Sequence, residues 1–195
     1  MTRTDVINRV ARDINAGTYA ELGVRNPADN FDKVNVPNKC GCDLTRNDDD
    51  RITQQSTDEF FATTKAKGLF FIDADHRHEQ NLKDFRNAIF ALRKGGAIIM
   101  HDCLPKTADA CVDEKPPGGG PWNGTVWKTW RYIRGRKDLA SAVVSCDHGC
   151  GIVMRAKRKD AIDSSDESLN WANADQWANV VSEADFAVKG LGCLG

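Results

Sequence analysis

The sequence predicts an α/β fold in which short parallel strands alternate with helices. Short apolar segments recur along the chain, and segments with the helical spacing of apolar residues separate them. The unit at residues 68–103 shows this most clearly, because an apolar strand at residues 69–72 is followed by an amphipathic helix at residues 82–92 and a second apolar strand at residues 97–100. Apolar strands joined through a helix indicate a parallel sheet that is buried on both faces.

The remaining elements continue this alternation. We expect a helix within residues 1–16, strands at residues 18–23, 39–44 and 52–55, a helix beginning at residues 56–59, a helix at residues 126–133, and strands at residues 142–144 and 151–154. The turn at residues 147–149 predicts that the last two strands form a hairpin. Residues 106–121 are rich in proline and glycine, so both a mobile lid and a plain connection remain open. A tail helix at residues 167–188 either docks on the domain or frays.

Length and charge limit the class of protein. A chain of 195 residues is typical of one domain, so we expect a single domain over residues 1–195 with its core at residues 18–156. With 27 Lys+Arg against 28 Asp+Glu, no excess of positive charge would hold a polyanion, and nucleic acid is not expected as a partner. No apolar run approaches the about 20 residues that a membrane crossing needs, and the first helix lacks the apolar block of a signal peptide. We therefore expect a cytoplasmic protein without a membrane partner, of unknown oligomeric state.

Acidic residues stand at or close to the ends of three predicted strands: Glu21, Asp43 and Asp73. Ligands of open parallel sheets bind at this edge, where a carboxylate after the second strand can accept both hydroxyls of a ribose. Gly23 stands alone, because the chain has neither the G-x-G-x-x-G pattern nor the P-loop pattern that brings backbone close to a pyrophosphate. The site therefore favours a nucleoside cofactor without phosphate, such as S-adenosylmethionine.

Six segments that surround these positions form an ordered set of motifs. They are YAELGVRNP at residues 19–27, GCD at 41–43, TDEFF at 57–61, FIDADH at 71–76, GGAIIMHDC at 95–103 and WNGTVWK at 122–128. Together they resemble class I S-adenosylmethionine-dependent methyltransferases, and most closely the methyltransferase domain 24 family, over roughly residues 19–154. The resemblance implies a Rossmann-like three-layer α/β sandwich whose mostly parallel seven-stranded sheet ends in an antiparallel strand, which agrees with the predicted hairpin.

The resemblance also implies a set of cofactor-binding residues. These are Glu21, Gly23, Asn26, Asp43, Leu44, Thr57, Asp58, Asp73 and Ala74. Asp43 would hold the ribose, Thr57 and Asp58 would lie beside the adenine, and Asp73 would lie under the methionine end. The chain departs from the family at Leu44, where proline is usual, and at Thr125, where an acidic residue is usual; the second departure leaves substrate recognition open.

Catalysis of methyl transfer requires a base near the sulfonium, because the reaction is an in-line displacement by a nucleophile that loses its proton. Four candidates follow the fourth and fifth strands: Asp73, His76, His101 and Asp102. His101 or His76 is the preferred base, since an unperturbed imidazole titrates near about 6.5. The alternative is that these polar residues only satisfy loop backbone.

A divalent metal such as Mg²⁺ is a second candidate at the same positions. Asp73 and Asp102 match two of the three ligand positions of catechol-type oxygen methyltransferases, and Cys103 occupies the third, where a thiol is a poor ligand for a hard cation. The candidate ligands are therefore Asp73, His76 and Asp102. A rival site for zinc would use Cys40, Cys42, Cys146 and Cys150. Cysteines in a central strand are more typical of small buried apolar residues.

The sequence thus predicts a methyltransferase that transfers a methyl group from S-adenosylmethionine to a small molecule, with a hydroxyl oxygen as the expected acceptor. A nucleoside-binding module without turnover is one alternative. A nicotinamide-dependent oxidoreductase is another, which the single glycine at Gly23 disfavours. The acceptor itself is not predicted, because substrate loops vary freely on one scaffold.

Overall fold

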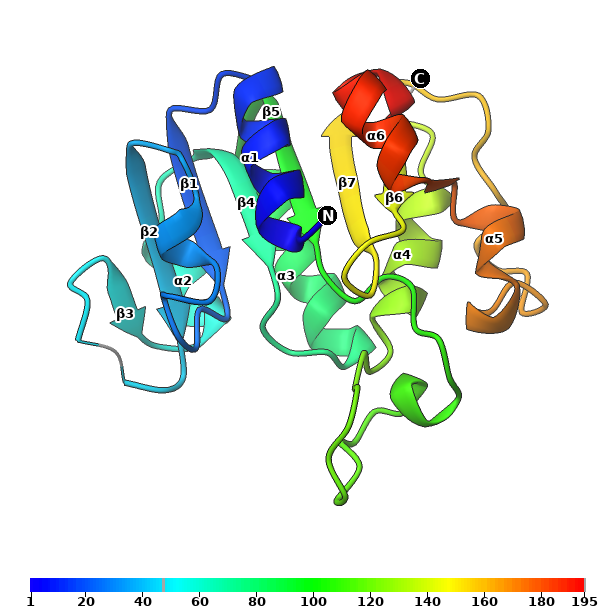
Figure 1. The fold of residues 1–195 in the computed structure, drawn as a ribbon, viewed down its shortest axis with the longest axis horizontal. Helices are drawn as coiled ribbons and strands as arrows, with labels where there is room; N and C mark the ends of the chain where they lie inside the picture. Colours follow the sequence, from blue (N-terminus) through cyan, green and yellow to red (C-terminus); the bar gives the residue numbers. More distant parts are fainter. Residues whose placement is uncertain (47, 195) are drawn as a thin grey trace.

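The computed structural model describes residues 1–46 and 48–194, and in it a central sheet is covered by helices on both faces (Figure 1). The strands are β1 (Thr18–Leu22), β2 (Asn38–Asp43), β3 (Ile52–Gln54), β4 (Lys67–Ile72), β5 (Leu92–Met100), β6 (Leu139–Val144), β7 (Cys150–Arg155) and β8 (Val180–Val181). The helices are α1 (Arg3–Asp13), α2 (Thr57–Thr63), α3 (His78–Ala91), α4 (Val126–Arg134), α5 (Ala174–Trp177) and α6 (Glu183–Lys189). Short 3-10 turns lie at Phe31–Lys33, Asp109–Cys111, Trp171–Asn173 and Gly190–Leu194.

The sheet has the strand order β3-β2-β1-β4-β5-β7-β6-β8. All neighbouring strands are parallel except β7, which runs antiparallel to both β5 and β6. The predicted α/β class, the parallel sheet and the antiparallel last strand of the hairpin are therefore confirmed. The sheet is one strand wider than the seven strands expected, because the two-residue β8 pairs with the free edge of β6.

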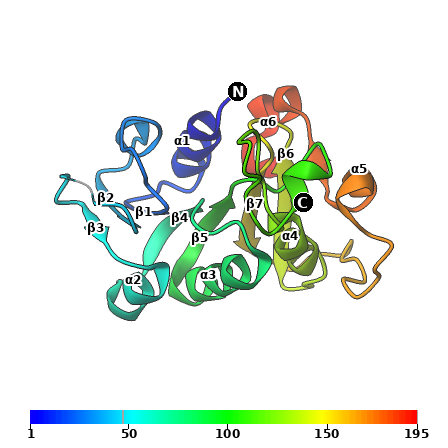
Figure 2. The ribbon, with the colours of Figure 1, turned by 90° about the horizontal axis from the view of Figure 1, so that it is seen from below.

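Each central strand is apolar on both faces, as parallel strands under two helical layers should be. On β4, Leu69 and Phe71 pack with the apolar residues of α1, while Phe70 and Ile72 pack with those of α3 and α4. Figure 2 shows the two layers, with α1 and α6 on one side of the sheet and α2, α3 and α4 on the other. This double burial explains why the strands read as continuous apolar runs.

Two helix starts follow from side-chain capping. The helix predicted to begin at residues 56–59 starts with a capping box, since the Ser56 hydroxyl accepts from the Glu59 N–H and the Glu59 carboxylate accepts from the Ser56 N–H. Thr2 and Asp5 form the same box at the start of α1. A capping residue typically contributes about 1 kcal/mol to helix stability, and the second box fixes where α1 begins beside the site.

The single tail helix predicted over residues 167–188 is wrong. Val180 and Val181 form β8 instead, and they separate α5 from α6. Asn179, which follows α5, has a φ of 55°, a left-handed conformation that does not continue an α-helix. The hydroxyl of Ser182 caps the start of α6. The helix is therefore interrupted on both sides of the β-branched residues Val180 and Val181.

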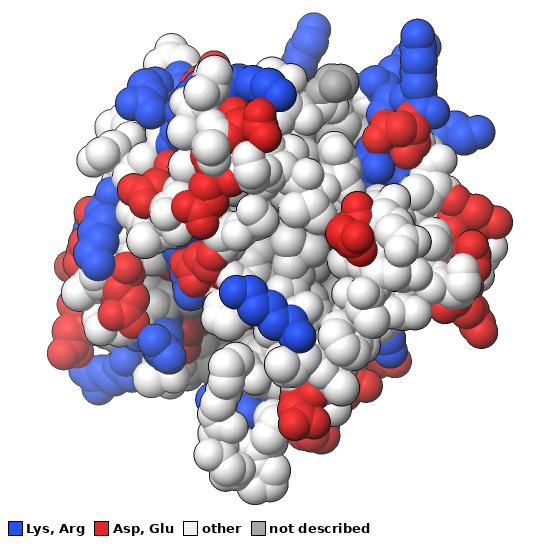
Figure 3. All heavy atoms as spheres, turned by 45° about the vertical axis from the view of Figure 1, so that its right-hand side comes forward, with Lys and Arg blue, Asp and Glu red and all other residues white. Residues whose placement is uncertain are grey.

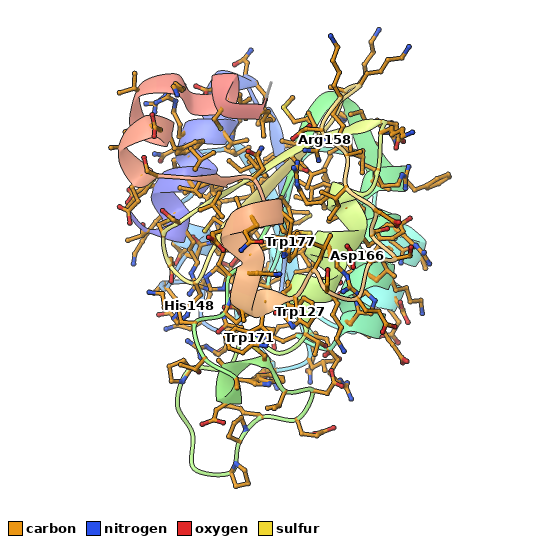
Figure 4. All side chains as sticks on the ribbon, turned by 90° about the vertical axis from the view of Figure 1, so that its right-hand side faces the viewer. Trp127, His148, Arg158, Asp166, Trp171 and Trp177 are labelled. Carbon is orange, nitrogen blue, oxygen red and sulfur yellow. The ribbon has the colours of Figure 1, made fainter. Side chains whose placement is uncertain are left out.

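The tail docks on the domain rather than fraying. The buried guanidinium of Arg134 on α4 donates to the backbone oxygen of Trp177 and to the Asp160 carboxylate. The indole N–H of Trp130 donates to the oxygen of Ala178. Figure 4 labels Trp171 and Trp177 on this segment and shows α5 lying against α4.

The surface carries both signs of charge. On the face drawn in Figure 3, basic and acidic side chains are interspersed, in keeping with the formal net charge of -1. None of the helices in the described part of the chain is both long and apolar enough to cross a membrane.

Candidate active site

A cavity of about 1010 Å³ lies at the carboxyl ends of the parallel strands. The strand register explains its position, because Leu22 pairs with Cys42 on one side and Ile72 on the other, and Ile72 pairs with Met100. The side chains at and just beyond these residues therefore emerge together at one edge of the sheet. The polar groups that the sequence placed on separate strands meet in one cavity.

Most of the predicted cofactor residues line this cavity. Those that do are Glu21, Gly23, Asp43, Leu44, Thr57, Asp58, Asp73 and Ala74. Asn26 does not: its side chain closes a local turn, accepting from the Ala28 N–H and donating to the Asp29 carboxylate. Its proximity in sequence to the first loop does not bring it to the cavity.

Gly23 and Asp43 shape one end of the cavity. Gly23 has a φ of +85°, and a Cβ on it would lie 2.2 Å from the backbone oxygen of Asp73, so only glycine fits between the ends of β1 and β4. The Asp43 carboxylate accepts from the N–H of Arg25 with one oxygen and from the N–H of Thr45 with the other, each at 2.7 Å. These two bonds fix the carboxylate at the mouth of β2 while leaving lone pairs for a ligand.

Glu21 lines the cavity from a buried position. Its carboxylate accepts from the hydroxyl of Tyr19 at 2.6 Å and from the amide of Asn30 at 3.0 Å. Burial raises the pKa of Glu21 to about 8, against the opposing effect of these hydrogen bonds and with a further rise from the charge of Asp73. The charge of Arg3 on α1 lowers the pKa of this group, but less than burial raises it. Glu21 therefore stays protonated near neutral pH.

The raised pKa of Glu21 predicts a pH-dependent stability. Because the folded state keeps this proton between the ordinary pKa of 4.5 and about 8, the unfolding free energy falls as pH rises through that window. Between pH 5 and pH 7 the free energy of unfolding of Glu21→Gln should fall by about 2 kcal/mol less than that of wild type, because the variant has no proton to lose. Urea denaturation at several pH values measures this difference. Glu79→Gln, at an exposed position, is the control and should keep the wild-type slope. Equal slopes in Glu21→Gln and wild type would contradict the prediction.

The four predicted catalytic residues converge in the same cavity, with Asp73 directly beside Gly23. The Nε2 atom of His76 lies 3.4 Å from Asp73 and its Nδ1 atom lies 3.3 Å from Asp102. The Nδ1 atom of His101 lies 3.3 Å from Asp73 and 3.2 Å from Asp102. Two imidazoles and two carboxylates thus form one cluster at the ends of β4 and β5.

The two histidines have different surroundings. The side chain of His101 is 4% exposed, and Asp147 also lies 3.5 Å from its Nε2 atom. Burial lowers the pKa of His101, but the charges of Asp73, Asp102 and Asp147 outweigh it and raise the pKa well above its ordinary range. The side chain of His76 is 18% exposed and lies nearer the open cavity. Burial lowers the pKa of His76 as well, and Asp73 and Asp102 outweigh it and raise that pKa above its ordinary value. His101 is thus the enclosed imidazole among the carboxylates, and His76 is the more exposed one.

Sequence reasoning missed two charged residues of this cluster. The guanidinium of Arg3 donates to Asp73 at 2.6 Å and to Asp147 at 2.8 Å. Asp147 lies at the tip of the β6–β7 hairpin with a φ of 44°. Arg3 and Asp147 are 144 positions apart, so no local pattern pairs them. Only the packing of α1 against the sheet brings Arg3 to the site.

The proline- and glycine-rich segment forms a wall of the cavity. Its end is anchored by Trp122, whose ring stacks on His76 with centroids 4.8 Å apart and whose indole N–H donates to the oxygen of Val112. The hydroxyl of Thr125 accepts from the His78 N–H and donates to Asp113. Thr125 thus accepts a hydrogen bond from a backbone N–H, as a carboxylate at this position could. The threonine that replaces the acidic residue usual in the family therefore keeps an oxygen acceptor at this position.

The predicted metal ligands fit a divalent cation. Single ligand atoms of Asp73, His76 and Asp102 lie within 4.8 Å of one another. The thiol of Cys103 points into the core, where it donates to the oxygen of Met100, so this residue is no ligand. The amide of Asn123 lies against Asp102 at 2.6 Å, and its buried oxygen has no hydrogen-bond partner among the described residues. Two carboxylates, an imidazole and a nearby amide oxygen suit a hard cation.

The four cysteines of the zinc alternative cannot share one ion. Cys40 and Cys42 lie on β2, whereas Cys146 follows β6 and Cys150 begins β7. The strands β1, β4 and β5 lie between the two pairs. At about 4.8 Å per strand, the pairs are roughly 19 Å apart. The zinc alternative is wrong.

Comparisons with known proteins bear on this geometry. Residues 30–103 match the family model of a methyltransferase domain. No curated protein matches the chain. The fold is similar to that of an O-methyltransferase from Bacillus cereus in complex with SAH, with a TM-score of 0.55, 13% identity, and coverage of 81% of this chain and 82% of that one.

Two further solved structures extend the likeness. One is the O-methyltransferase TomG from Streptomyces achromogenes, involved in tomaymycin synthesis and in complex with SAM, with a TM-score of 0.59, 12% identity and 79% coverage of each chain. The other is the MycE methyltransferase of the mycinamycin biosynthetic pathway, in complex with Mg, SAH and mycinamycin VI, with a TM-score of 0.52 and 14% identity. This likeness covers 84% of the present chain and 50% of the MycE chain.

Proposed function

We propose that this chain, a class I methyltransferase by its fold and by the methyltransferase-domain model that it matches, transfers a methyl group from S-adenosylmethionine to a hydroxyl of a small molecule. One observation carries the proposal: the same cavity holds a fixed carboxylate at Asp43 and an accessible imidazole at His76. A volume of about 1010 Å³ is at the upper end of single-ligand pockets, which span about 300–1,000 Å³, so it suits a cofactor and an acceptor together.

The cofactor would lie along the ends of β1, β2 and β4. Asp43 would accept hydrogen bonds from the ribose hydroxyls with the lone pairs that Arg25 and Thr45 leave free. Gly23 lets the methionine end approach the backbone beside Asp73, which no residue with a Cβ could allow. Three of the similar solved structures hold SAM or SAH, which supports this choice of cofactor.

His76 would be the base. Its Nδ1–H donates to the backbone oxygen of Trp122 at 3.1 Å, which leaves Nε2 as the proton acceptor. The acceptor hydroxyl gives its proton to Nε2 while its oxygen forms a bond to the methyl carbon. The bond from that carbon to sulfur breaks, and its electron pair stays on the sulfur of S-adenosylhomocysteine. Asp73 stabilises the imidazolium, and the enclosed His101 keeps Asp73 and Asp102 in place.

The same residues support a second arrangement. Asp73, Asp102 and Nε2 of His76 would hold a divalent cation, which would lower the pKa of the acceptor hydroxyl. One of the similar structures contains Mg, which supports this arrangement. The two arrangements differ in their need for a metal, because His76 would serve either as a base or as a ligand.

Chelation separates them. If His76 is the base, we expect turnover in the presence of excess EDTA to stay within about twofold of the untreated rate, because no step needs a metal. The measurement is methyl transfer with and without chelator, followed by repletion with Mg²⁺. Loss of turnover that Mg²⁺ restores would instead assign His76 to the metal.

The experiment that tests the function follows a labelled methyl group. The protein is incubated with S-adenosylmethionine labelled in the methyl group and a small-molecule extract, and labelled products are identified by mass spectrometry. Transfer to oxygen in wild type and its loss in His76→Ala would support the proposal. Binding of S-adenosylhomocysteine without any transfer would support a nucleoside-binding module, and binding of a nicotinamide cofactor instead would support an oxidoreductase.

A further inference from the structure

The side chain of Gln80 lies in the wall of the cavity beside the start of α2. Gln80 is in the first turn of α3 and lines the cavity together with Thr57 and Asp58. Its amide nitrogen donates to Asp84 at 2.9 Å, to Thr57 at 3.1 Å and to Asp58 at 3.4 Å. The NH₂ group is therefore surrounded by oxygen atoms of the protein.

These contacts fix which end of the amide faces the ligand. The Asp84 side chain is fully buried, and Asp58 is held in place by Lys83, whose ammonium lies 2.6 Å from it. Turning the amide over would bring the Gln80 oxygen against two carboxylates, which would repel it. No described residue donates a hydrogen bond to the Oε1 atom of Gln80. The cavity wall therefore presents a hydrogen-bond acceptor at this point.

We propose that Oε1 of Gln80 accepts a hydrogen bond from the 6-amino group of the adenine and so selects an adenosyl cofactor over an inosyl one. The inference rests on the proposed function, which places the adenine beside Thr57 and Asp58. Adenine has a donor at its 6-position, whereas hypoxanthine has a carbonyl oxygen there. An acceptor whose orientation is fixed attracts the first and repels the second.

The test compares two ligands that differ only at that position. S-adenosylhomocysteine and S-inosylhomocysteine are titrated calorimetrically into wild type, Gln80→Met and the control Glu79→Gln. Wild type and the control should prefer the adenosyl compound by at least about tenfold, because one ligand gains a hydrogen bond and the other meets an unpaired acceptor. Gln80→Met should lower that preference by about tenfold through weaker binding of the adenosyl compound and stronger binding of the inosyl compound.

A second variant tests the fixed orientation. Asp84→Asn keeps the volume of the buried side chain but removes the charge that repels a turned amide, so Gln80 can present either end to the ligand. The preference should fall to an intermediate ratio of about threefold. An unchanged preference in both Gln80→Met and Asp84→Asn would overturn the inference while leaving the proposed function intact. Failure of wild type to bind S-adenosylhomocysteine at all would overturn the proposed function with it.

Discussion

His76→Ala is expected to lower kcat by about 10²–10⁴-fold while the affinity for S-adenosylhomocysteine stays within about twofold of wild type. The imidazole lies in the cavity beside Asp73 and Asp102, and its Nδ1 atom is bonded to the Trp122 oxygen, so Nε2, which lies 3.4 Å from Asp73, is the atom proposed to take the proton. The proposed cofactor end, around Asp43, is built from β1 and β2. The measurement is kcat with a labelled methyl donor, together with calorimetric titration of S-adenosylhomocysteine.

A matched histidine two positions along the chain serves as the control. His78 lies outside the lining of the cavity, and its ring contacts the hydroxyl of Thr129 at 3.0 Å. His78→Ala should therefore keep kcat within a few-fold of wild type. If His76→Ala retained full kcat and His101→Asn lost it with the fold preserved, the role of base would pass to His101.

Asp43→Ala is expected to weaken S-adenosylhomocysteine binding by about 1.5–3 kcal/mol, or roughly 10–150-fold in Kd. The carboxylate would make charge-assisted hydrogen bonds to the ribose, and its orientation is set by the N–H groups of Arg25 and Thr45. Calorimetric titration measures the effect. The turnover of cofactor-saturated enzyme should fall far less than the affinity, because Asp43 does not touch the acceptor end.

Two companion variants separate binding from general charge effects. Asp43→Asn should weaken binding less than Asp43→Ala, since the amide keeps one oxygen acceptor. Asp32→Ala removes an exposed carboxylate that pairs with Arg51 away from the cavity, and it should leave the affinity unchanged. Wild-type affinity in Asp43→Ala would remove the ribose role from this residue.

Much of the site could be predicted because the sheet itself assembles it. In parallel strands that pair in register, the side chains just past the strand ends are neighbours whatever lies between them in sequence. Asp73 and His101 follow the paired residues Ile72 and Met100, so their meeting is a consequence of strand pairing alone. The apolar strands and Gly23 allowed the sequence alone to predict that a ligand site lies at the carboxyl-terminal edge of the sheet.

The contacts that the sequence did not reveal depend on how separate layers pack. Arg3 reaches Asp147 only after α1 has docked on the sheet and the β6–β7 hairpin has closed. The amide of Gln80 is oriented by acceptors on α2 and by a buried carboxylate on its own helix. Neither set of contacts can be recognised from a spacing in the sequence. Arg3 and Asp147 lie on different elements, as do Gln80 and Thr57. Gln80 and Asp84 have the four-residue spacing that is common on any helix.

In the tail, strand pairing overrides the helical spacing of the apolar residues. Trp177 and Val181 have the four-residue spacing of one helical face, and the sequence therefore favoured a helix through them. The free edge of β6 offers Val180 and Val181 backbone partners that a helix would not use. Hydrogen bonds to an existing strand decided the outcome.

Gly23 leaves no free space between the ends of β1 and β4. Since any Cβ there would strike the carbonyl of Asp73, a bulkier residue introduced to reshape the nucleoside end would also push Asp73 away from Arg3 and His101. Under the proposed function, an enlarged sulfonium donor is therefore expected to be tolerated worse by a variant with a substitution at Gly23 than by one with a smaller side chain elsewhere in the lining of the cavity.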